Sequence, residues 1–186
     1  MLIKTIFSGF GGQGVIMMGY LLAMAGMYEE KNVTCLPSYG AEVRGGTANC
    51  TVVISDEEIA SPVASEPEFA VLMNNPSLFR FQNQVQSGGA IFLNSSMIES
   101  RPVRGDLDVY EIPANALARQ LKEDRVTNMI MLGAFVKKTG LVTLETMNHV
   151  LKDTFATRNP GIVKLNKSAL LVGYDYLEGE KSANAS

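Results

Sequence analysis

The stretch Ser8–Val15, SGFGGQGV, separates a short apolar run at residues 2–7 from a longer apolar segment at residues 13–28. Four glycines in six residues raise the entropic cost of ordering this backbone. Gly9, Gly11 and Gly14 satisfy the pattern G-x-G-x-x-G between a predicted strand and a predicted helix. Such glycines allow a tight turn, and the helix N-terminus offers free N–H groups to an anion. The stretch therefore predicts an α/β fold whose first loop holds a phosphate or a similar anion.

The dinucleotide-binding pattern also requires an acidic residue at the end of the second strand, where it binds a ribose hydroxyl. The predicted second strand, residues 33–36, ends in Pro37-Ser38-Tyr39-Gly40 without one. Glu29 and Glu30 precede this strand and are typical of a solvated helix end. NAD and FAD are therefore disfavoured as ligands. A purely structural role of the glycines, in helix–strand packing, stays open as an alternative.

Strand-like and helix-like segments alternate along the rest of the chain. This order predicts a single Rossmann-like α/β domain with three layers, a mostly parallel sheet and helices on both faces. We expect further strands at 48–54, 69–73, 90–93 and 108–112, and further helices from 75 to about 88 and at 114–122, 126–138, 144–155 and 167–176. The domain is expected to span residues 1–178, followed by a disordered tail at 179–186.

Composition excludes several classes of protein. An apolar fraction of 46% with 19% charged residues is typical of a globular chain, and a net charge of −3 without basic runs disfavours double-stranded nucleic acid as a partner. Cys35 and Cys50 form no CxxC motif, so we expect two buried thiols and no metal bound by this chain alone. His149 is the single histidine, which disfavours a Ser-His-Asp triad. We find no signal peptide or membrane-spanning run and expect a cytoplasmic protein.

A second glycine-rich stretch, PSYGAEVRGG at residues 37–46, follows the predicted second strand. Arg44 offers a planar fork for phosphate or carboxylate, and Tyr39 offers a stacking face. Because the carboxyl ends of parallel strands meet at one sheet edge, the two glycine-rich loops should face one crevice. The alternative is a surface pair of Arg44 and Glu42 on an ordinary turn.

Four segments together resemble one protein family: GFGGQGV, PSYGAEVRGG, ISDEEIASP and TNMIMLGA. They are similar to the gamma subunit of 2-oxoacid:ferredoxin oxidoreductases, a family that includes pyruvate, 2-oxoisovalerate, 2-oxoglutarate and indolepyruvate enzymes. The resemblance runs from about Ile3 to Tyr174. It implies oxidative decarboxylation of a 2-oxoacid with coenzyme A to acyl-CoA, CO2 and reduced ferredoxin. It also implies that this chain is inactive alone, contributes no catalytic residue, and helps to form the coenzyme A site.

The resemblance places coenzyme A against the two glycine-rich loops. Main-chain N–H groups of residues 11–14 would face the diphosphate, Arg44 would pair with a phosphate, and Tyr39 would pack on the adenine or ribose. Asn128 would donate to the ligand or to the first loop, or it would only bond at its helix terminus, where Thr127 is the alternative cap. The residues expected at the site are Gly9, Gly11, Gly12, Gln13, Gly14, Tyr39, Arg44, Gly45, Gly46 and Asn128.

The implied partners are alpha and beta subunits that carry thiamine diphosphate, with an iron–sulfur cluster on a partner and a ferredoxin-like delta subunit. A homodimer of the isolated chain is a further expectation, because ten methionines and an apolar first helix favour association. Branched-chain 2-oxoacids and 2-oxoglutarate are the leading substrates by resemblance. Two other functions stay open: a stand-alone adenine-nucleotide-binding regulatory module, and a small flavin or NAD reductase.

Overall fold

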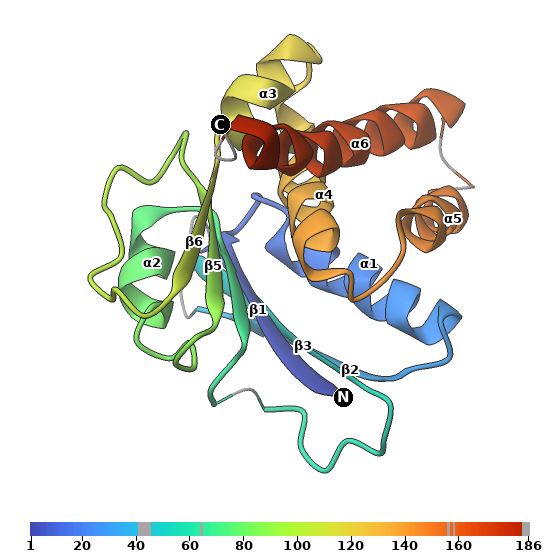
Figure 1. The fold of residues 1–186 in the computed structure, drawn as a ribbon. Coiled ribbons are helices and arrows are strands. Elements are labelled where there is room, and N and C mark those ends of the chain that lie inside the picture. The colour runs from blue at the N-terminus through green and yellow to red at the C-terminus, as the bar shows by residue number, and fades with distance from the viewer. Residues whose placement is uncertain (41–45, 64, 156, 158, 184–186) are drawn as a thin grey trace.

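The computed structural model describes residues 1–40, 46–63, 65–155, 157 and 159–183. Its centre is a six-stranded sheet in the order β2-β3-β1-β4-β5-β6 (Figure 1). The strands are β1 (Leu2–Phe10), β2 (Asn32–Tyr39), β3 (Thr47–Ser55), β4 (Phe69–Leu72), β5 (Ala90–Asn94) and β6 (Asp108–Ile112). All six lie where the apolar runs predict them, although β1 and β2 extend three residues further than expected.

Among these strands β3 runs against the others, while β1, β4, β5 and β6 pair in parallel. The predicted mostly parallel sheet is confirmed, with a β2–β3 hairpin added at one edge. Phe10 of β1 pairs with Thr47 of β3, and Tyr39 of β2 pairs with Ala48 of β3. The ends of β1 and β2 therefore lie at one edge of the sheet, as the sequence predicts, although β3 separates the two strands.

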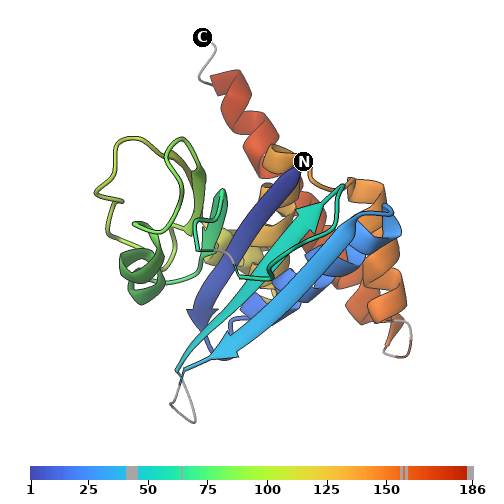
Figure 2. The ribbon, with the colours of Figure 1, turned by 90° about the horizontal axis from the view of Figure 1, so that it is seen from below.

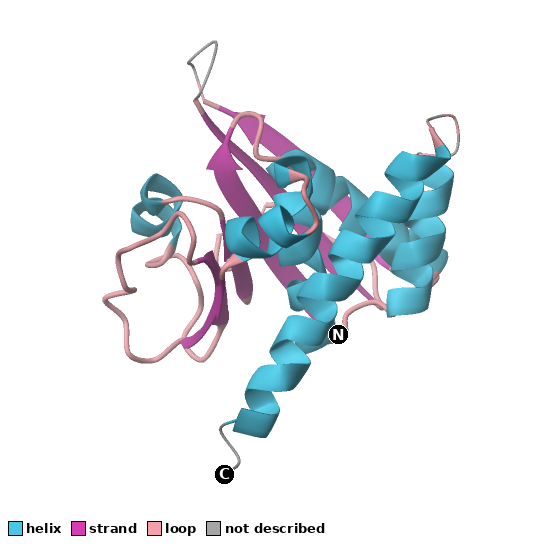
Figure 3. Ribbon diagram, turned by 90° about the horizontal axis from the view of Figure 1, so that it is seen from above, coloured by secondary structure: helices cyan, strands magenta, loops and turns pink. Residues whose placement is uncertain are grey.

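Helices cover both faces of the sheet, as predicted, but unequally. Figures 1 and 3 show α2 on one side and the other helices on the opposite side. In the described part of the chain the helices are α1 (Val15–Tyr28), α2 (Asn75–Phe81), α3 (Ala114–Gln120), α4 (Thr127–Thr139), α5 (Leu144–Thr154) and α6 (Pro160–Ala183), with a 3-10 turn η1 (Asp124–Val126). None of these helices has the length and apolar character that a bilayer crossing requires.

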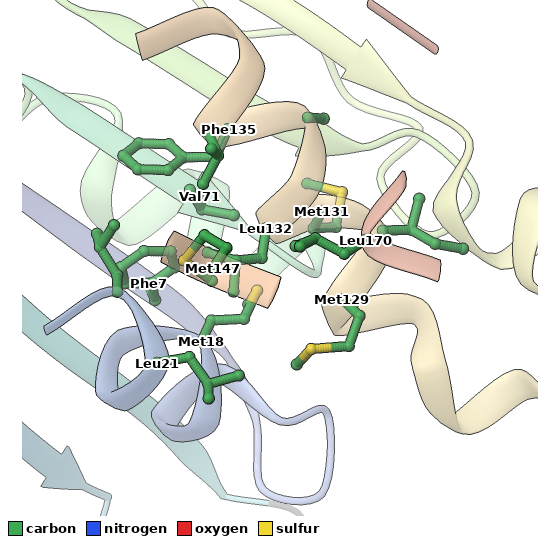
Figure 4. Close-up of a cluster of buried hydrophobic side chains, with 14 of the residues drawn as sticks. Phe7, Met18, Leu21, Val71, Met129, Met131, Leu132, Phe135, Met147 and Leu170 are labelled. Atoms are coloured by element: carbon green, nitrogen blue, oxygen red, sulfur yellow. The ribbon is translucent and has the colours of Figure 1, made fainter. Parts of the chain in front are cut away.

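Alternate side chains of β1 enter two separate cores, as the period of a strand requires. Ile6 belongs to the smaller core beneath α2, and Phe7 belongs to the larger core beneath the other helices. Phe7 meets Phe135 of α4 edge to face, with ring centroids 5.7 Å apart. Methionines fill much of this larger core, including Met18 and Met131 (Figure 4), because their flexible side chains adapt to irregular gaps.

Two glycines set the distance between α4 and α6. A methyl group on Gly133 would overlap the carbonyl of Leu170, and one on Gly173 would overlap the carbonyl of Ile130. The two helix backbones therefore touch along this seam. Packing of this kind stabilises a helix of 24 residues where the sequence pattern predicted only 167–176.

Helix α6 differs from the prediction at both ends. Asn159, before Pro160, accepts a hydrogen bond from the N–H of Gly161 at 2.8 Å, so the apparent Asn-Pro-Gly turn is a helix start. The helix continues to Ala183 and so includes residues 179–183 of the expected tail. Residues 184–186 lie outside the described part.

Helix α2 ends at Phe81, seven residues before the predicted stop at Gly88. Its Asn74 cap accepts from the N–H of Ser77 at 2.9 Å, so the start is as the sequence indicates. Beyond the helix, the guanidinium of Arg104 donates to the carbonyls of Gln82 and Val85. Those carbonyls are satisfied by a side chain from another loop, and the chain leaves the helical path.

Strand β2 forms one edge of the sheet, with most of its side chains exposed (Figure 2). Cys35 on this strand is exposed, whereas Cys50 on β3 is buried, so the prediction of two buried thiols is wrong for Cys35. An edge position explains the difference, since β2 has a neighbouring strand on one side only. Pro37, opposite Cys50 in the register, is a residue that sheets tolerate at such edges.

Candidate functional site

The loop between β1 and α1 requires glycine at positions 12 and 14. Gly12 has φ +96° and Gly14 has φ +75°, both in the left-handed region that side chains disfavour. Gly9 is required for another reason: a Cβ there would lie 2.6 Å from Gln13 Oε1 and 2.9 Å from Met73 Cβ. At Gly11 a Cβ would meet only the carbonyl of Gly46, at 3.7 Å.

Main-chain N–H groups of this loop divide into two sets. Gly11 donates to the carbonyl of Gly46 at 2.9 Å, and Gln13 donates to the carbonyl of Phe10 at 3.1 Å. These two are already engaged within the chain, contrary to the expectation that they face a ligand. The first hydrogen bond of α1 runs from Met18 to the carbonyl of Gly14, so the N–H groups of residues 15–17 have no acceptor within the helix. Gly14 caps α1 without a side chain, which leaves a partial positive charge at this end.

The side chain of Gln13 faces away from this helix start and ties the loop to β4. Its Oε1 accepts from the N–H of Phe10 at 2.7 Å and from Asn74 Nδ2 at 3.0 Å. Its Nε2 donates to the carbonyl of Met73 at 3.4 Å. Gln13 therefore positions the loop through its side chain and is absent from the pocket lining described next.

A pocket of about 560 Å³ opens beside the loop and the start of α1. The loop contributes one wall, the exposed face of α1 the second, and the β2–β3 hairpin the third. Its lining residues are Phe10, Gly11, Gly12, Gly14, Val15, Ile16, Met17, Tyr20, Tyr39 and Ala48. None of these carries a charge. The site thus combines apolar walls with a helix N-terminus, and it suits a ligand with an anionic group attached to an apolar or aromatic body.

Asn128, at the start of α4, donates from Nδ2 to the carbonyl of Gly14 at 3.4 Å. Of the roles considered, the structure therefore shows donation to the first loop. A Cβ on Gly14 would overlap this amide, so the two residues fit each other. Thr127 does not cap the helix, because its hydroxyl donates back to the carbonyl of Asp124 at 2.8 Å.

Beyond Met17 lies a smaller hollow of about 310 Å³, which Asn128 also lines. Arg125 lines this hollow, and its guanidinium bonds both carboxylate oxygens of Glu123 at 2.9 and 3.0 Å. Met17 lines both the main pocket and this hollow, whereas Asn128 lines the hollow alone.

The structure brings together most of the predicted site. Gly11, Gly12, Gly14 and Tyr39 line one pocket, and the Gly11–Gly46 bond joins the two glycine-rich loops. Gly9 is buried and lies outside the lining. Arg44 and Gly45, with the alternative Arg44–Glu42 pair, lie outside the described residues.

Sequence reasoning missed Tyr20 and Met17. Tyr20 is 45% exposed, although its helix is largely apolar. Its position one helical turn beyond Ile16, on the helix that the loop begins, was the available signal.

Glu29 and Glu30 precede β2, at the end of the strand away from Tyr39. Glu29 accepts from the N–H of Thr143 at 2.6 Å, in the junction between α1 and α5. No group of three or more potential metal ligands occurs among the described residues.

The fold and the site define a Rossmann-like α/β domain with a glycine-rich loop at the start of its first helix. The family model for pyruvate ferredoxin/flavodoxin oxidoreductase matches residues 4–176, and the chain belongs to this family. This finding confirms the resemblance that the four sequence segments carry.

The chain covers different shares of the length of two curated relatives. Ketoisovalerate oxidoreductase subunit VorA of Methanothermobacter thermautotrophicus is 36% identical over 96% of this chain, but the chain spans 38% of VorA's length. The 2-oxoglutarate synthase subunit KorC of Methanocaldococcus jannaschii is 32% identical, with 90% of both chains covered.

Two solved structures share the fold. The gamma subunit of a keto/oxoacid ferredoxin oxidoreductase from Geobacter sulfurreducens superposes with a TM-score of 0.79 and 26% identity, covering 93% of this chain and 96% of that one. The 2-oxoglutarate:ferredoxin oxidoreductase of Magnetococcus marinus gives a TM-score of 0.88 at 22% identity, covering 96% of this chain and 31% of that one. The latter was solved with 2-oxoglutarate, coenzyme A and succinyl-CoA bound.

Proposed function

We propose that this chain is the gamma component of a 2-oxoacid:ferredoxin oxidoreductase and that it contributes to binding coenzyme A. The complex would decarboxylate a 2-oxoacid oxidatively and yield acyl-CoA, CO2 and reduced ferredoxin. The comparison with KorC, a 2-oxoglutarate synthase subunit of which 90% is covered, supports this assignment. The related Magnetococcus structure with coenzyme A bound supports the choice of ligand.

The pocket at the start of α1 carries this proposal. Coenzyme A combines a diphosphate with an adenine and a long, uncharged pantetheine arm. The free N–H groups at the start of α1 suit the diphosphate, because a helix N-terminus attracts an anion. Tyr39, 71% exposed at the pocket rim, offers a face for the adenine, and Ile16 and Met17 offer apolar contact for the arm.

Other parts of the reaction are assigned to other polypeptides. Thiamine diphosphate and the iron–sulfur cluster belong, in this proposal, to alpha and beta subunits and a ferredoxin-like delta subunit. VorA, of which this chain spans 38%, carries a region similar to this chain within a longer polypeptide. This chain's own contribution is binding: it orients the acyl acceptor and supplies no acid, base or nucleophile. We assign the complex to the cytoplasm.

The test uses the complex reconstituted with its partner subunits and measures viologen reduction with a panel of 2-oxoacids. We expect Tyr39→Ala to raise the KM for coenzyme A about 2- to 10-fold, the loss of about 0.5–1.5 kcal/mol of aromatic contact. The KM for the 2-oxoacid should stay unchanged. Leu36→Ala is the matched control, because Leu36 is exposed on the same strand but on the opposite face of the sheet.

Arg44→Ala extends the test to a residue outside the described part. The sequence-based expectation is an increase of about tenfold or more in the KM for coenzyme A, since a charged hydrogen bond contributes about 1.5–3 kcal/mol. If both variants leave that KM unchanged, coenzyme A does not bind here. Binding of ATP by the isolated chain, without activity in the complex, would instead support the regulatory-module alternative.

A further inference from the structure

The chain's two cysteines face each other across the β2–β3 hairpin. Their Sγ atoms lie 3.4 Å apart, although the residues are 15 positions apart in the sequence. In the register Cys35 pairs with Val52 and Cys50 pairs with Pro37, so the cysteines are diagonal neighbours on one face of the sheet. The sulfurs are in contact and unbonded.

The two thiols have different surroundings. Cys35 is exposed on the edge strand, and Cys50 is fully buried against α1, where the absence of a side chain on Gly19 makes room for its sulfur. The pKa of Cys35 is lowered to about 7 because the Cys50 thiol donates a hydrogen bond to its sulfur. The same hydrogen bond, together with burial, raises the pKa of Cys50. One accessible, readily ionised thiol thus lies beside a protonated partner.

We propose that Cys35 and Cys50 are a redox modification site at which a hydroperoxide converts the dithiol to an intramolecular disulfide that thiols reverse. The Cys35 thiolate attacks a peroxide oxygen, the O–O bond breaks, and the released oxygen leaves as water or alcohol with the thiol proton. The Cys50 sulfur then attacks the sulfur of the sulfenic acid on Cys35 and forms the disulfide bond. The hydroxyl of the sulfenic acid leaves as water with the Cys50 proton. Two thiols give two electrons and two protons to one peroxide.

The hairpin permits this bond. The sulfurs must approach from 3.4 Å to about 2.05 Å, and β2 has a neighbouring strand on one side only, so it can shift. The bond would lie four residues from Tyr39 along β2 and two residues from Ala48 along β3, and both of these residues line the pocket. Oxidation would therefore fix the pocket wall that the hairpin forms. This inference stands on the cysteine geometry and does not depend on the proposed function.

The test treats the full chain, alone and in complex with its partner subunits, with hydrogen peroxide and then counts thiols after denaturation. The chain has two cysteines, so we expect the count to fall from two to none, with loss of two hydrogen atoms in the intact mass. A dithiol reductant should restore both thiols, and non-reducing electrophoresis should show no dimer.

Single substitutions separate the two steps. In Cys50→Ser, and in Cys50→Ala should the first variant fold poorly, oxidation should stop at a sulfenic acid on Cys35 that a 1,3-dione reagent traps. In Cys35→Ser the remaining thiol should react at least about tenfold more slowly, because it is buried. Cross-linked dimers, one persistent thiol in the wild type, or equal reactivity of the two variants would overturn the proposal.

Discussion

Gly11 donates its main-chain N–H to the carbonyl of Gly46 at 2.9 Å, and this hydrogen bond joins the two glycine-rich loops. The loops begin at the ends of β1 and β2, which β3 separates, so the bond crosses from β1 to the start of β3. The pocket wall formed by the hairpin is thereby fixed relative to the start of α1.

Gly14→Ala tests the fit between the first loop and α4. The substitution places a methyl group against the Asn128 amide and forces a left-handed φ of +75° on a residue with a side chain. We expect a loss of about 1–3 kcal/mol in the free energy of unfolding, measured by urea titration. Adding Asn128→Ala should recover part of that loss. Gly105→Ala, at an open position, is the control and should be near neutral.

Gln13→Ala removes the side chain that ties the loop to β4. The N–H of Phe10 and the amide of Asn74 both lose an acceptor, so we expect a loss of about 1–3 kcal/mol in stability. Gln13→Glu keeps this acceptor and should retain most of the stability. Equal effects of the two substitutions would contradict the role assigned to the side-chain oxygen.

The lowered pKa of Asp106 predicts that the protein loses stability as the pH falls. The hydrogen bonds from the Arg104 guanidinium, and then from Ser87, lower the pKa of Asp106 to about 2. The unfolded chain binds that proton near pH 3.9, so the stabilisation is complete above about pH 4 and disappears as the pH falls toward 2. Urea midpoints measured from pH 5 to pH 2 should fall less steeply in Asp106→Asn than in the wild type.

Gly173→Ala tests the seam between α4 and α6. Alanine normally stabilises a helix interior by about 1 kcal/mol relative to glycine. Here the methyl group overlaps the Ile130 carbonyl, so we expect destabilisation of about 1–3 kcal/mol in thermal unfolding. Gly161→Ala, in the exposed first turn of the same helix, should have little effect. An increase in thermal stability in Gly173→Ala would show that the backbones of α4 and α6 do not touch.

The sequence predicts the strands well because each is a compact apolar or β-branched run. It predicts their ends less well, because pairing partners decide them: Gly9 joins β1 only through its pairing with Ala48. The length of α6 was not predictable from local pattern, since the helix is stabilised by packing against α4, a segment distant in the sequence, at Gly133 and Gly173.

At the site, the sequence predicts which residues gather but not what each hydrogen bond does. The glycine pattern places the loop and helix correctly, yet the acceptors of the Gly11 and Gln13 N–H groups come from Gly46 and Phe10. Such pairings follow from the turn geometry and from the hairpin register. Predicting that Tyr20 lines the pocket would have required knowing which face of α1 the other elements leave open.

Pro37 has a consequence for how the chain behaves at high concentration. The bond from Gly40 N–H to the Thr47 carbonyl sets the alternation of the β2–β3 ladder, in which the backbone nitrogen of residue 37 is directed outward. A second molecule that tried to extend the sheet along β2 would find no donor at that point. The proline thus protects the exposed margin of the sheet against strand-to-strand polymerisation while leaving the internal ladder intact.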